Sequence, residues 1–443
     1  MRSIYLRLIG IIIINITPLA WAGDQVVFGP RKGESIFSIS EYSNMMGNNG
    51  GSSTSESPFN NSCPSAGSFS NLRVRITAAP GAGNSRTYTF RNNGADTALA
   101  CTISGASDTT CSDTSDSISI TAGDDVSFEN SQLCCPNAAN FDFSARFTST
   151  TAGETIMLGG IGNGDIDTSR YLPVMGTEEV AGGGDSEAAI NMVMPVAGTA
   201  KNLYVDLTAV PGVGNSWAMT LRKNGADTAL TCTISGLSTT CTDTSNTVSI
   251  AVGDLLAIAA TETGTATITK MKPSLTYLVG TDGDFVVSAA SREALSTSAT
   301  QYLNPDAGDT GESTTENDVD NISEDFTVKS IYVDLGTAPG ASKSRVFTLR
   351  QNDGDASPTL SCTVSDTSTT CNASATVLIA DGDSVDTSSA VSSTPAGSEV
   401  TVSYLGTTAA AVERRIMIFG KRRKYDENYI DSLLSNLGVL SIS

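Results

Sequence analysis

The chain has 443 residues, with 47 acidic and 26 basic residues and no histidine, which gives a formal net charge of −21 at pH 7. This acidic balance repels phosphate backbones and argues against nucleic-acid binding, and the lack of histidine excludes Ser-His-Asp and Cys-His catalysis and histidine-ligated zinc or copper. Two carboxylates could still hydrolyse a glycoside, but no pair stands out among so many, so we expect a protein that is not an enzyme.

The N-terminus has the order of a secretory signal peptide. Two arginines precede an apolar run, which ends at the small residues of Ala20-Trp21-Ala22. The run is short and contains Asn15 and Pro18, which favours cleavage over an uncleaved membrane anchor. We therefore expect residues 1–22 to be removed, no membrane span in the mature chain, and a secreted or extracellular-surface protein, with the periplasm as the alternative.

One module occurs three times in the chain. The text that begins Leu-Arg-Lys-Asn-Gly-Ala-Asp-Thr at Leu221 recurs in similar form at Phe90 and Leu349, and each copy is followed by two cysteines. Such a period indicates repeated structural units. We predict three domains after the signal peptide and a separate tail, with the bounds 23–160, 161–280, 281–420 and 421–443.

Each module contains about eight short segments with the pattern of half-buried strands. Apolar residues alternate with others in Leu203–Leu207, for example, and Pro211-Gly212 then predicts a turn. The dipeptide at Asn224-Gly225 predicts a tight hairpin. We expect the last strands of the modules at 155–158, 275–278 and 415–419. The fold class is therefore all-β, with three tandem antiparallel β-sandwich domains of jelly-roll-like wiring and a short C-terminal helix.

Nine cysteines in an exported chain predict disulfides. The repeated pairs are Cys101–Cys111, Cys232–Cys241 and Cys362–Cys371. The first module contains three more, Cys63, Cys134 and Cys135. We expect a bridge from Cys63 to one of the adjacent pair, with Cys134 as the first candidate. The remaining thiol would either link two chains or be buried and free.

Pairs of aspartates on predicted turns are candidate calcium ligands, since calcium prefers carboxylate oxygens. They are Asp165, Asp167, Asp282, Asp284, Asp318 and Asp320. None of these stretches continues into a twelve-residue loop that ends in Glu, and Asp-Gly is also ordinary turn chemistry. We expect no cofactor, with calcium as the alternative.

The pattern changes from strand to helix after residue 420. A basic cluster at 421–424 precedes apolar residues with the spacing i, i+3, i+4 and i+7, namely Ile430, Leu433, Leu434 and Leu437. Such a helix would pack on the third module, dock on a neighbouring subunit or lie on a membrane surface. We treat its apolar stripe as a candidate assembly contact.

Two further features recur at matching positions. Loop segments of different sequence lie at 48–67, 180–186 and 306–325, and we expect them at one end of each sandwich, where either binding loops or tolerated insertions are found. An arginine also recurs, as Arg91, Arg222 and Arg350. Because the hairpin turn does not require it, we expect a salt bridge with Asp227 or with a neighbouring module.

The repeated pattern Leu-x-Val-x-Leu, Pro-Gly, Leu-Arg-x-Asn-Gly-Ala-Asp-Thr-x-Leu and Gly-Asp resembles a module of uncharacterised bacterial and phage-associated structural proteins. In general plan it is also similar to the jelly rolls of phage fibres and of tumour-necrosis-factor-like proteins. The resemblance covers nearly all of residues 25–420 and implies a structural module with no assigned functional residues. A virion protein does not need a secretion signal, which favours a protein exported by a cell.

These observations predict an exported, non-catalytic structural or adhesive surface protein, such as a subunit of an extracellular filament or layer. Its partners would be further copies of itself or a cell-surface or extracellular component, since repetition supplies length and valency. One alternative is a secreted glycan- or receptor-binding protein that uses the variable end loops. The other is a virion-type structural protein of a capsid or fibre.

Overall fold

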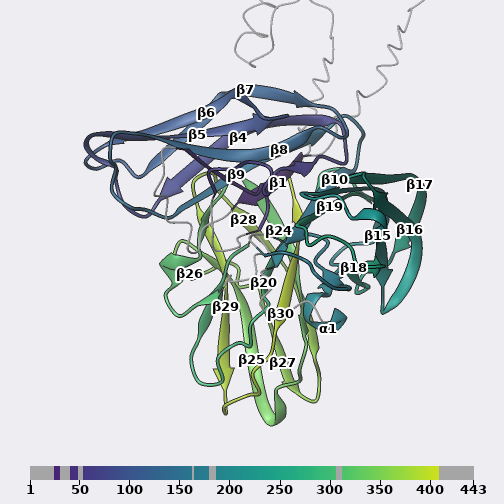
Figure 1. The fold of residues 1–443 in the computed structure, drawn as a ribbon. Helices are drawn as coiled ribbons and strands as arrows, with labels where there is room; N and C mark the ends of the chain where they lie inside the picture. The colour runs from purple at the N-terminus through teal and green to yellow at the C-terminus, as the bar shows by residue number, and fades with distance from the viewer. Residues whose placement is uncertain are drawn as a thin grey trace, which may run out of the picture. The chain divides into compact units, whose positions relative to one another are not determined.

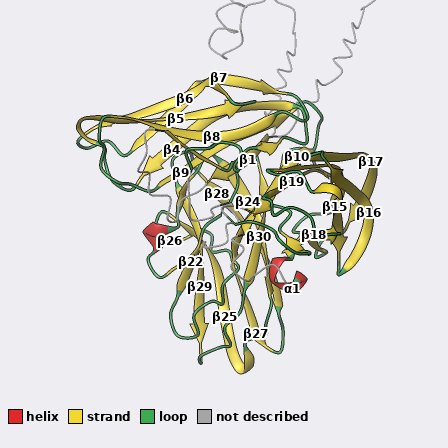
Figure 2. Ribbon diagram, viewed as in Figure 1, coloured by secondary structure: helices red, strands yellow, loops and turns green. Residues whose placement is uncertain are grey.

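The computed structural model describes residues 24–29, 40–47, 53–161, 164–178, 186–305 and 312–408, which belong to one compact unit and are mostly β-strand (Figures 1 and 2). Helical structure in these ranges is confined to α1 (Glu187–Ile190) and the 3₁₀ turn η1 (Glu316–Asp318). No helix among them has the length and apolar character to cross a membrane. The predicted signal peptide, the strand at 415–419 and the tail helix with Ile430 to Leu437 lie outside the described residues.

The first module consists of two sheets. One has the order β1 (Asp24–Gly29), β9 (Phe141–Ser149), β4 (Gly67–Ile76) and β7 (Thr110–Ile120). The other has the order β2 (Ser40–Ser43), β8 (Asp125–Leu133), β5 (Gly81–Asn92) and β6 (Ala95–Gly105), with β3 (Asn61–Ser62) also beside β8. All of these pairs are antiparallel. The first strand lies beside the last, and the chain crosses between the sheets at every step except β2 to β3 and β5 to β6, so the order is that of a jelly roll.

The second module repeats this order. Its first sheet contains β10 (Glu154–Ile161), β19 (Met271–Val279), β14 (Gly198–Leu207) and β17 (Thr240–Ile250), and β12 (Gly176–Glu178) runs parallel beside β10. Its second sheet contains β11 (Arg170–Leu172), β18 (Leu255–Thr263), β15 (Gly212–Lys223) and β16 (Ala226–Gly236), with β13 (Met192–Val193) beside β18.

The third module has the same plan with small additions. Its first sheet contains β20 (Asp284–Ser291), β30 (Val400–Thr407), β24 (Phe326–Leu335) and β28 (Thr370–Ile379). Its second sheet contains β22 (Glu312–Ser313), β21 (Gln301–Leu303), β29 (Ser384–Ser392), β25 (Gly340–Gln351), β26 (Gly354–Asp355) and β27 (Ser361–Asp366), with β23 (Asn321–Ile322) beside β29. The all-β prediction is therefore confirmed.

The boundary between the first two modules differs from the prediction. The segment predicted as the last strand of the first module, 155–158, lies in β10, which pairs with β19 and is the first strand of the second module. The predicted boundary after residue 160 therefore cuts a strand, and the modules meet at 150–153. The first and last strands of a jelly roll are both buried apolar strands and lie side by side, so their sequence patterns alone do not tell them apart.

The strands show the alternating burial of side chains and the turn residues that the sequence predicts. In β14, Leu203 and Val205 are buried while the side chains between them are partly exposed. The hairpin between β15 and β16 turns at Asn224 and Gly225, whose φ angles are 51° and 77°. Asparagine and glycine tolerate this left-handed region. The predicted Asn-Gly hairpin is therefore confirmed, and Trp217 lies in the core, fully buried.

Candidate functional site

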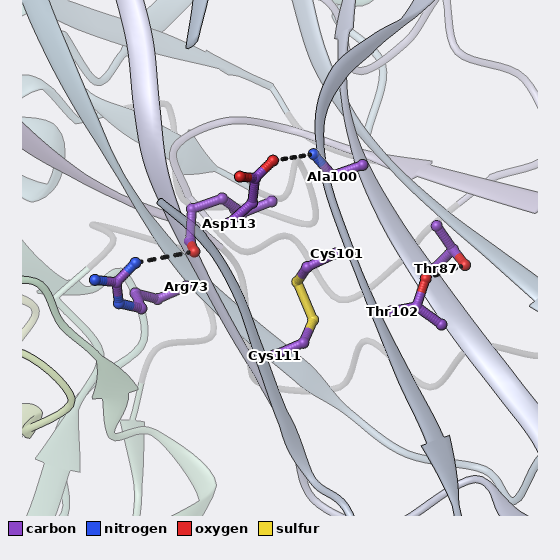
Figure 3. Close-up of a disulfide and its surroundings, with 8 residues drawn as sticks. Arg73, Thr87, Ala100, Cys101, Thr102, Cys111 and Asp113 are labelled. Carbon is purple, nitrogen blue, oxygen red and sulfur yellow. Dashed lines mark hydrogen bonds between the residues drawn. A yellow bond between two sulfur atoms is a disulfide. The ribbon is translucent and has the colours of Figure 1, made fainter. Parts of the chain in front are cut away.

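Each module is pinned by a disulfide across the open edge of its sandwich. Cys101 on β6 is bonded to Cys111 on β7, and these strands are the edge strands of different sheets (Figure 3). Cys232–Cys241 and Cys362–Cys371 are formed in the same way. The three predicted bridges are confirmed, and they suggest an oxidising, extracellular type of environment.

In each of the first two modules, an aspartate near the disulfide holds the backbone of the strands that carry the two cysteines. The carboxylate of Asp113 accepts hydrogen bonds from the backbone N–H groups of Ala100, Ser115 and Asp116, the first of which is drawn in Figure 3. Burial alone would raise the pKa of Asp113, but these hydrogen bonds outweigh it and lower the pKa. Asp243 does the same in the second module, whereas the third has Ala373 at this place on the paired strand.

The predicted bridge between Cys63 and Cys134 is wrong. Cys63 is fully buried, and its thiol donates a hydrogen bond to the backbone oxygen of Ser65. Cys134 and Cys135 are exposed and free. The prediction assumed that an exported chain pairs as many cysteines as it can, but Cys63 here behaves as a small apolar core residue.

The recurring arginines lie at the centre of a repeated cluster. Each guanidinium lies over a tyrosine ring, at 5.3 Å for Arg91 over Tyr42 and 5.7 Å for Arg222 over Tyr171 and for Arg350 over Tyr302. Each also binds an aspartate of its own hairpin, namely Asp96, Asp227 or Asp355. The third partner is a glutamate, namely Glu56, Glu187 or Glu316. The predicted salt bridge with Asp227 is therefore confirmed.

The glutamate is the part of this cluster that the sequence analysis missed. In the second module both guanidinium nitrogens Nε and Nη2 of Arg222 donate to the Glu187 carboxylate, at 3.1 and 2.9 Å. The hydrogen bonds to Glu187 and Asp227 raise the pKa of Arg222, so the cation persists at all ordinary pH values. Each glutamate lies a few residues before a two-residue strand, β3, β13 or β23, so the arginine ties the loop that carries this strand to the hairpin.

The loops that follow the glutamates dock on the next module. In each loop a two-residue strand packs against the last strand of the first sheet in a different module and against its neighbour. Thus β3 of the first module lies on β19 and β14 of the second, β13 of the second lies on β30 and β24 of the third, and β23 of the third lies on β9 and β4 of the first. The three contacts are cyclic. The predicted variable loops 48–67 and 306–325 contain β3 and β23, whereas β13 follows the predicted loop 180–186.

An asparagine shows the equivalence of two of these contacts. The side-chain amide of Asn61 donates to the backbone oxygen of Gly159 in β10, at 3.0 Å, and that of Asn321 donates to the backbone oxygen of Gly29 in β1, at 2.7 Å. Both asparagines are buried. The first strand of each receiving module therefore accepts the same kind of hydrogen bond, at Gly29 and Gly159, which are 130 residues apart in the chain.

The contact from the third module to the first is ionic. Arg75 on β4 binds Asp142 on β9 and Asp320 beside β23, with N–O distances of 3.2 and 2.8 Å. Asp142 also accepts a hydrogen bond from the backbone N–H of Ile322, at 2.6 Å. Both carboxylates are almost fully buried. Two more arginines of the first module, Arg146 and Arg73, bind Glu324, Asp325 and Asp381 of the third.

The contact from the first module to the second has the opposite charges at the same strand positions. Asp206 and Lys272 are paired across β14 and β19, where Arg75 and Asp142 are paired across β4 and β9. Lys272 donates to the side-chain oxygen of Asn60 and to the backbone oxygen of Ser57, and burial lowers its pKa. Burial likewise raises the pKa of Asp206, which lines a cavity of about 330 Å³.

The contact from the second module to the third is less charged. Asp334 and Thr401 occupy the same paired positions, and the Thr401 hydroxyl donates to the backbone oxygen of Asn191, at 2.7 Å. Arg292 donates to the backbone oxygen of Ala189, at 3.1 Å. Burial raises the pKa of Asp334 to about 6. Each of the three contacts therefore has its own charge pattern on a common backbone arrangement.

The predicted calcium ligands are dispersed and bound to protein groups. Asp165 pairs with Lys270, Asp167 with Arg170, Asp284 with Lys329 and Asp320 with Arg75. Asp282 accepts the backbone N–H of Gly153, and Asp318 accepts the hydroxyl of Ser313. No three Asp, Glu or Cys side chains in the described ranges are grouped so as to hold a metal ion. These aspartates are turn and salt-bridge residues, and the fold does not bring them together as a calcium site.

Comparison with known proteins gives little further information. No protein-family model and no curated protein matches the chain. Among solved structures, one similar chain comes from the work described as "Life in the extremes: atomic structure of Sulfolobus Turreted Icosahedral Virus". It is 11% identical, the match covers 77% of this chain and 79% of that one, and the TM-score is 0.20. A likeness this low carries no inference about the fold or the function of this chain.

Proposed function

We propose that the protein is a non-catalytic structural or adhesive building block that acts outside the cytoplasm. The observation that carries this proposal is the cyclic docking of the three modules, in which β3, β13 and β23 each lie on a different module. Loops at the ends of β-sandwiches are the usual place for a binding or catalytic site. Here the described parts of the loops 48–67 and 306–325 hold modules together through β3 and β23, and β13 does the same just after the loop 180–186. This supports a structural role that depends on a rigid subunit more than on a binding site in these loops.

The contacts between and within modules support a rigid subunit. The disulfides hold the sheet edges of each sandwich, the arginine clusters fix the start of each docking loop, and the buried ion pairs hold the third module on the first. Three similar modules in one body present three similar outer faces, which suits repeated contacts in a layer or filament. The disulfides support export to an oxidising compartment.

The alternative of a glycan or receptor site on the variable loops is less well supported. Of the loop predicted at 306–325, the described part is engaged inside the protein: Glu316 binds Arg350, Asp320 binds Arg75, and Asn321 binds the backbone of Gly29. These side chains are not free to contact a sugar. A ligand would have to bind elsewhere on the modules.

Imaging the native material tests the proposal. Antibody-labelled cells and culture medium should show the protein outside the cytoplasm in ordered filaments or a layer under the electron microscope. Finding it only in the cytoplasm, or only in nuclease-resistant particles that contain nucleic acid, would contradict the proposal, and the second result would favour the virion-type alternative. Turnover of a polysaccharide by the purified protein would contradict the absence of catalysis.

A further inference from the structure

The loop between β8 and β9 carries two exposed cysteines that the other modules lack. Loops of equal length, with bounds 134–140, 264–270 and 393–399, follow β8, β18 and β29. At matching positions the three modules have Leu133-Cys134-Cys135-Pro136, Thr263-Gly264-Thr265-Ala266 and Ser392-Ser393-Thr394-Pro395. The first module therefore has a leucine and two thiols where the other two have hydroxyl side chains or glycine.

The conformation of this loop does not depend on the thiols. The backbone N–H of Asn137 donates to the oxygen of Pro80, that of Thr267 to Pro211, and that of Ala396 to Pro339, each at 3.0 Å. The first loop residue has a positive φ in all three copies, at 67° for Cys134, 83° for Gly264 and 58° for Ser393. The module framework therefore sets the loop conformation, and glycine or serine serves at this position in the other two modules without a thiol.

Cys134 and Cys135 have no sulfur partner within their own chain. Six of the nine cysteines are in disulfides, and the thiol of Cys63 is buried in the core, where burial raises its pKa to about 12. The two adjacent cysteines are joined by a trans peptide, since the one cis bond in the described residues is Ser357–Pro358. Neighbouring Cα atoms are then about 3.8 Å apart, less than the roughly 4.4–6.8 Å of ordinary disulfides. A disulfide of ordinary geometry at these cysteines therefore needs a sulfur from another molecule.

We propose that Leu133, Cys134 and Cys135 form a covalent contact between two copies of this chain. In a twofold-symmetric pair, Cys134 of each copy is bonded to Cys135 of the other, so that all four thiols are used. A different protein would have to bring two adjacent thiols of its own to do the same. Leu133 is 65% exposed beside the thiols and would be covered by its symmetry mate. The inference goes beyond the proposed function and needs only the oxidising compartment that it assumes.

The bond-forming chemistry is thiol–disulfide exchange. A thiolate of one copy attacks the disulfide of a small oxidised carrier such as glutathione disulfide, and a thiolate of the second copy then displaces the carrier thiol. Two disulfides between the copies require two carrier disulfides, which leave as four carrier thiols. The protein sulfurs are oxidised, and the four thiol protons pass to the carrier.

The test uses the purified mature chain. It is reduced mildly enough to keep the three disulfides that join the sheet edges, and it is then exposed to glutathione disulfide. We expect a covalent dimer on non-reducing gels, with an intact mass of twice the chain less four hydrogens, that reverts to monomer with reductant. The matched variant replaces residues 133–136 by the corresponding residues of the second module, with the substitutions Leu133→Thr, Cys134→Gly, Cys135→Thr and Pro136→Ala. It should unfold at the wild-type temperature and stay a monomer.

Other outcomes would overturn the inference. A wild-type monomer lighter by two hydrogens would show a bridge within the chain, and a monomer carrying glutathione on both thiols would show that two copies do not meet. Native material in which these cysteines are bonded to a different protein would also overturn it. If the four-residue variant fails to fold, the double variant Cys134→Ser, Cys135→Ser replaces it. Because the oxidation is done with purified protein, its result does not depend on where the protein is exported.

Discussion

Two buried carboxyl groups stand out in the third module. Glu324 lies 2.8 Å from Arg146. Burial nevertheless raises its pKa to about 7, because the loss of solvation outweighs the lowering by Arg146. Burial and the neighbouring carboxylates Glu316 and Asp320 raise the pKa of Asp386 to about 9. Both groups bind a proton in the folded protein at a pH where the unfolded chain has released it.

This predicts a stability that falls as the pH rises. A carboxyl with a raised pKa contributes its full stability below the unfolded-state pKa of about 4. It loses that contribution as the pH rises to the folded-state pKa, which is about 7 for Glu324 and about 9 for Asp386. At about 1.4 kcal/mol per pH unit, the loss between pH 6 and pH 9.5 should be roughly 1 kcal/mol for Glu324 and roughly 4 kcal/mol for Asp386. We expect denaturant unfolding at pH 9.5 to give a smaller free energy than at pH 6, and Glu324→Gln and Asp386→Asn each to reduce the difference.

Exposed Asp108→Asn serves as the control and should leave the pH dependence unchanged. Carboxyls with lowered pKa, such as Asp113 and Asp243, lose their contribution only as the pH falls through their folded-state pKa, in the acid range, so they do not interfere. If neither carboxyl variant flattens the pH dependence, the raised pKa values are wrong.

Residue roles were predictable where the repeat made them visible. The three disulfides and the Arg222–Asp227 pair could be predicted because both partners lie in the repeated text. Glu187 could not, because its surrounding sequence differs from those of Glu56 and Glu316. Its spacing of 131 and 129 residues from them is the signal that could have found it. The bridge predicted for Cys63 was wrong because it was inferred from the number of cysteines, and that number does not show which thiol is buried in the core.

At the scale of the element, the docking loop is the unit that couples one module to the next. Arg222 is partly buried and holds Glu187 at the first turn of α1, and the same segment continues into β13 on the third module. Without the arginine, Glu187 would keep a carboxylate near the protein surface with no cation beside it. The loop would then lose its fixed starting point.

Arg222→Ala should therefore loosen this loop. We expect a loss of roughly 1–3 kcal/mol in the free energy of unfolding and faster hydrogen exchange of the backbone amides in 186–194. Lys223→Ala is the matched control, because the neighbouring lysine is more exposed and its side chain pairs with the Asp254 carboxylate and not with Glu187. Asp254 holds the loop through its backbone oxygen, which accepts the N–H of Met194 and does not depend on the lysine side chain. Exchange in 186–194 that stays at the wild-type rate in Arg222→Ala would show that the cluster does not order the loop.

The positions of the strands were easier to predict than the sheet or module to which each strand belongs. Period-two alternation identifies a half-buried strand such as β14 without reference to its neighbours. It does not say which sheet a fully buried strand joins, so β10 was assigned to the wrong module. The 130-residue spacing of the first residues of β1, β10 and β20, namely Asp24, Glu154 and Asp284, carries this information.

At the scale of the whole molecule, charge distinguishes three contacts that share one backbone arrangement. The strand pair that receives the loop carries Arg75 and Asp142 in the first module but Asp206 and Lys272 in the second. Asp320 thus finds a cation on the first module, and would meet a carboxylate at the same place on the second. The sequence could not reveal this, because these charges look like ordinary variation between copies until the contacts are known.

Exchanging the charges of Asp320 and Arg75 tests the contact between the third module and the first. Changing one residue should weaken the contact, and changing both should restore part of it. Asp320→Arg would place two arginines together and leave Asp142 to pair with both, so we expect a loss of roughly 3 kcal/mol or more in unfolding free energy. Adding Arg75→Asp should recover at least half, because the arginine introduced on the third module can then pair with the new aspartate and with Asp142. Denaturant unfolding of the single and double variants measures this.

The control is Asp381→Arg, which removes the exposed partner of Arg73 in the same contact and should cost about 1 kcal/mol or less. A double variant no more stable than Asp320→Arg alone would show that the ion pair does not select the partner module.

The cyclic docking has a consequence for chain connectivity. Thr408, just after the last strand β30, donates its hydroxyl to the backbone oxygen of Asp24, where β1 begins, at 2.8 Å. Residues 150–153 make the corresponding step from the first module to the second. A circular permutant that starts at Glu154 and joins residue 408 to residue 24 through a linker of that length would keep every strand pair and every docking contact described above. The docking contacts therefore fix the order in which the modules follow one another around the cycle, but they do not require that the chain begin with any particular module.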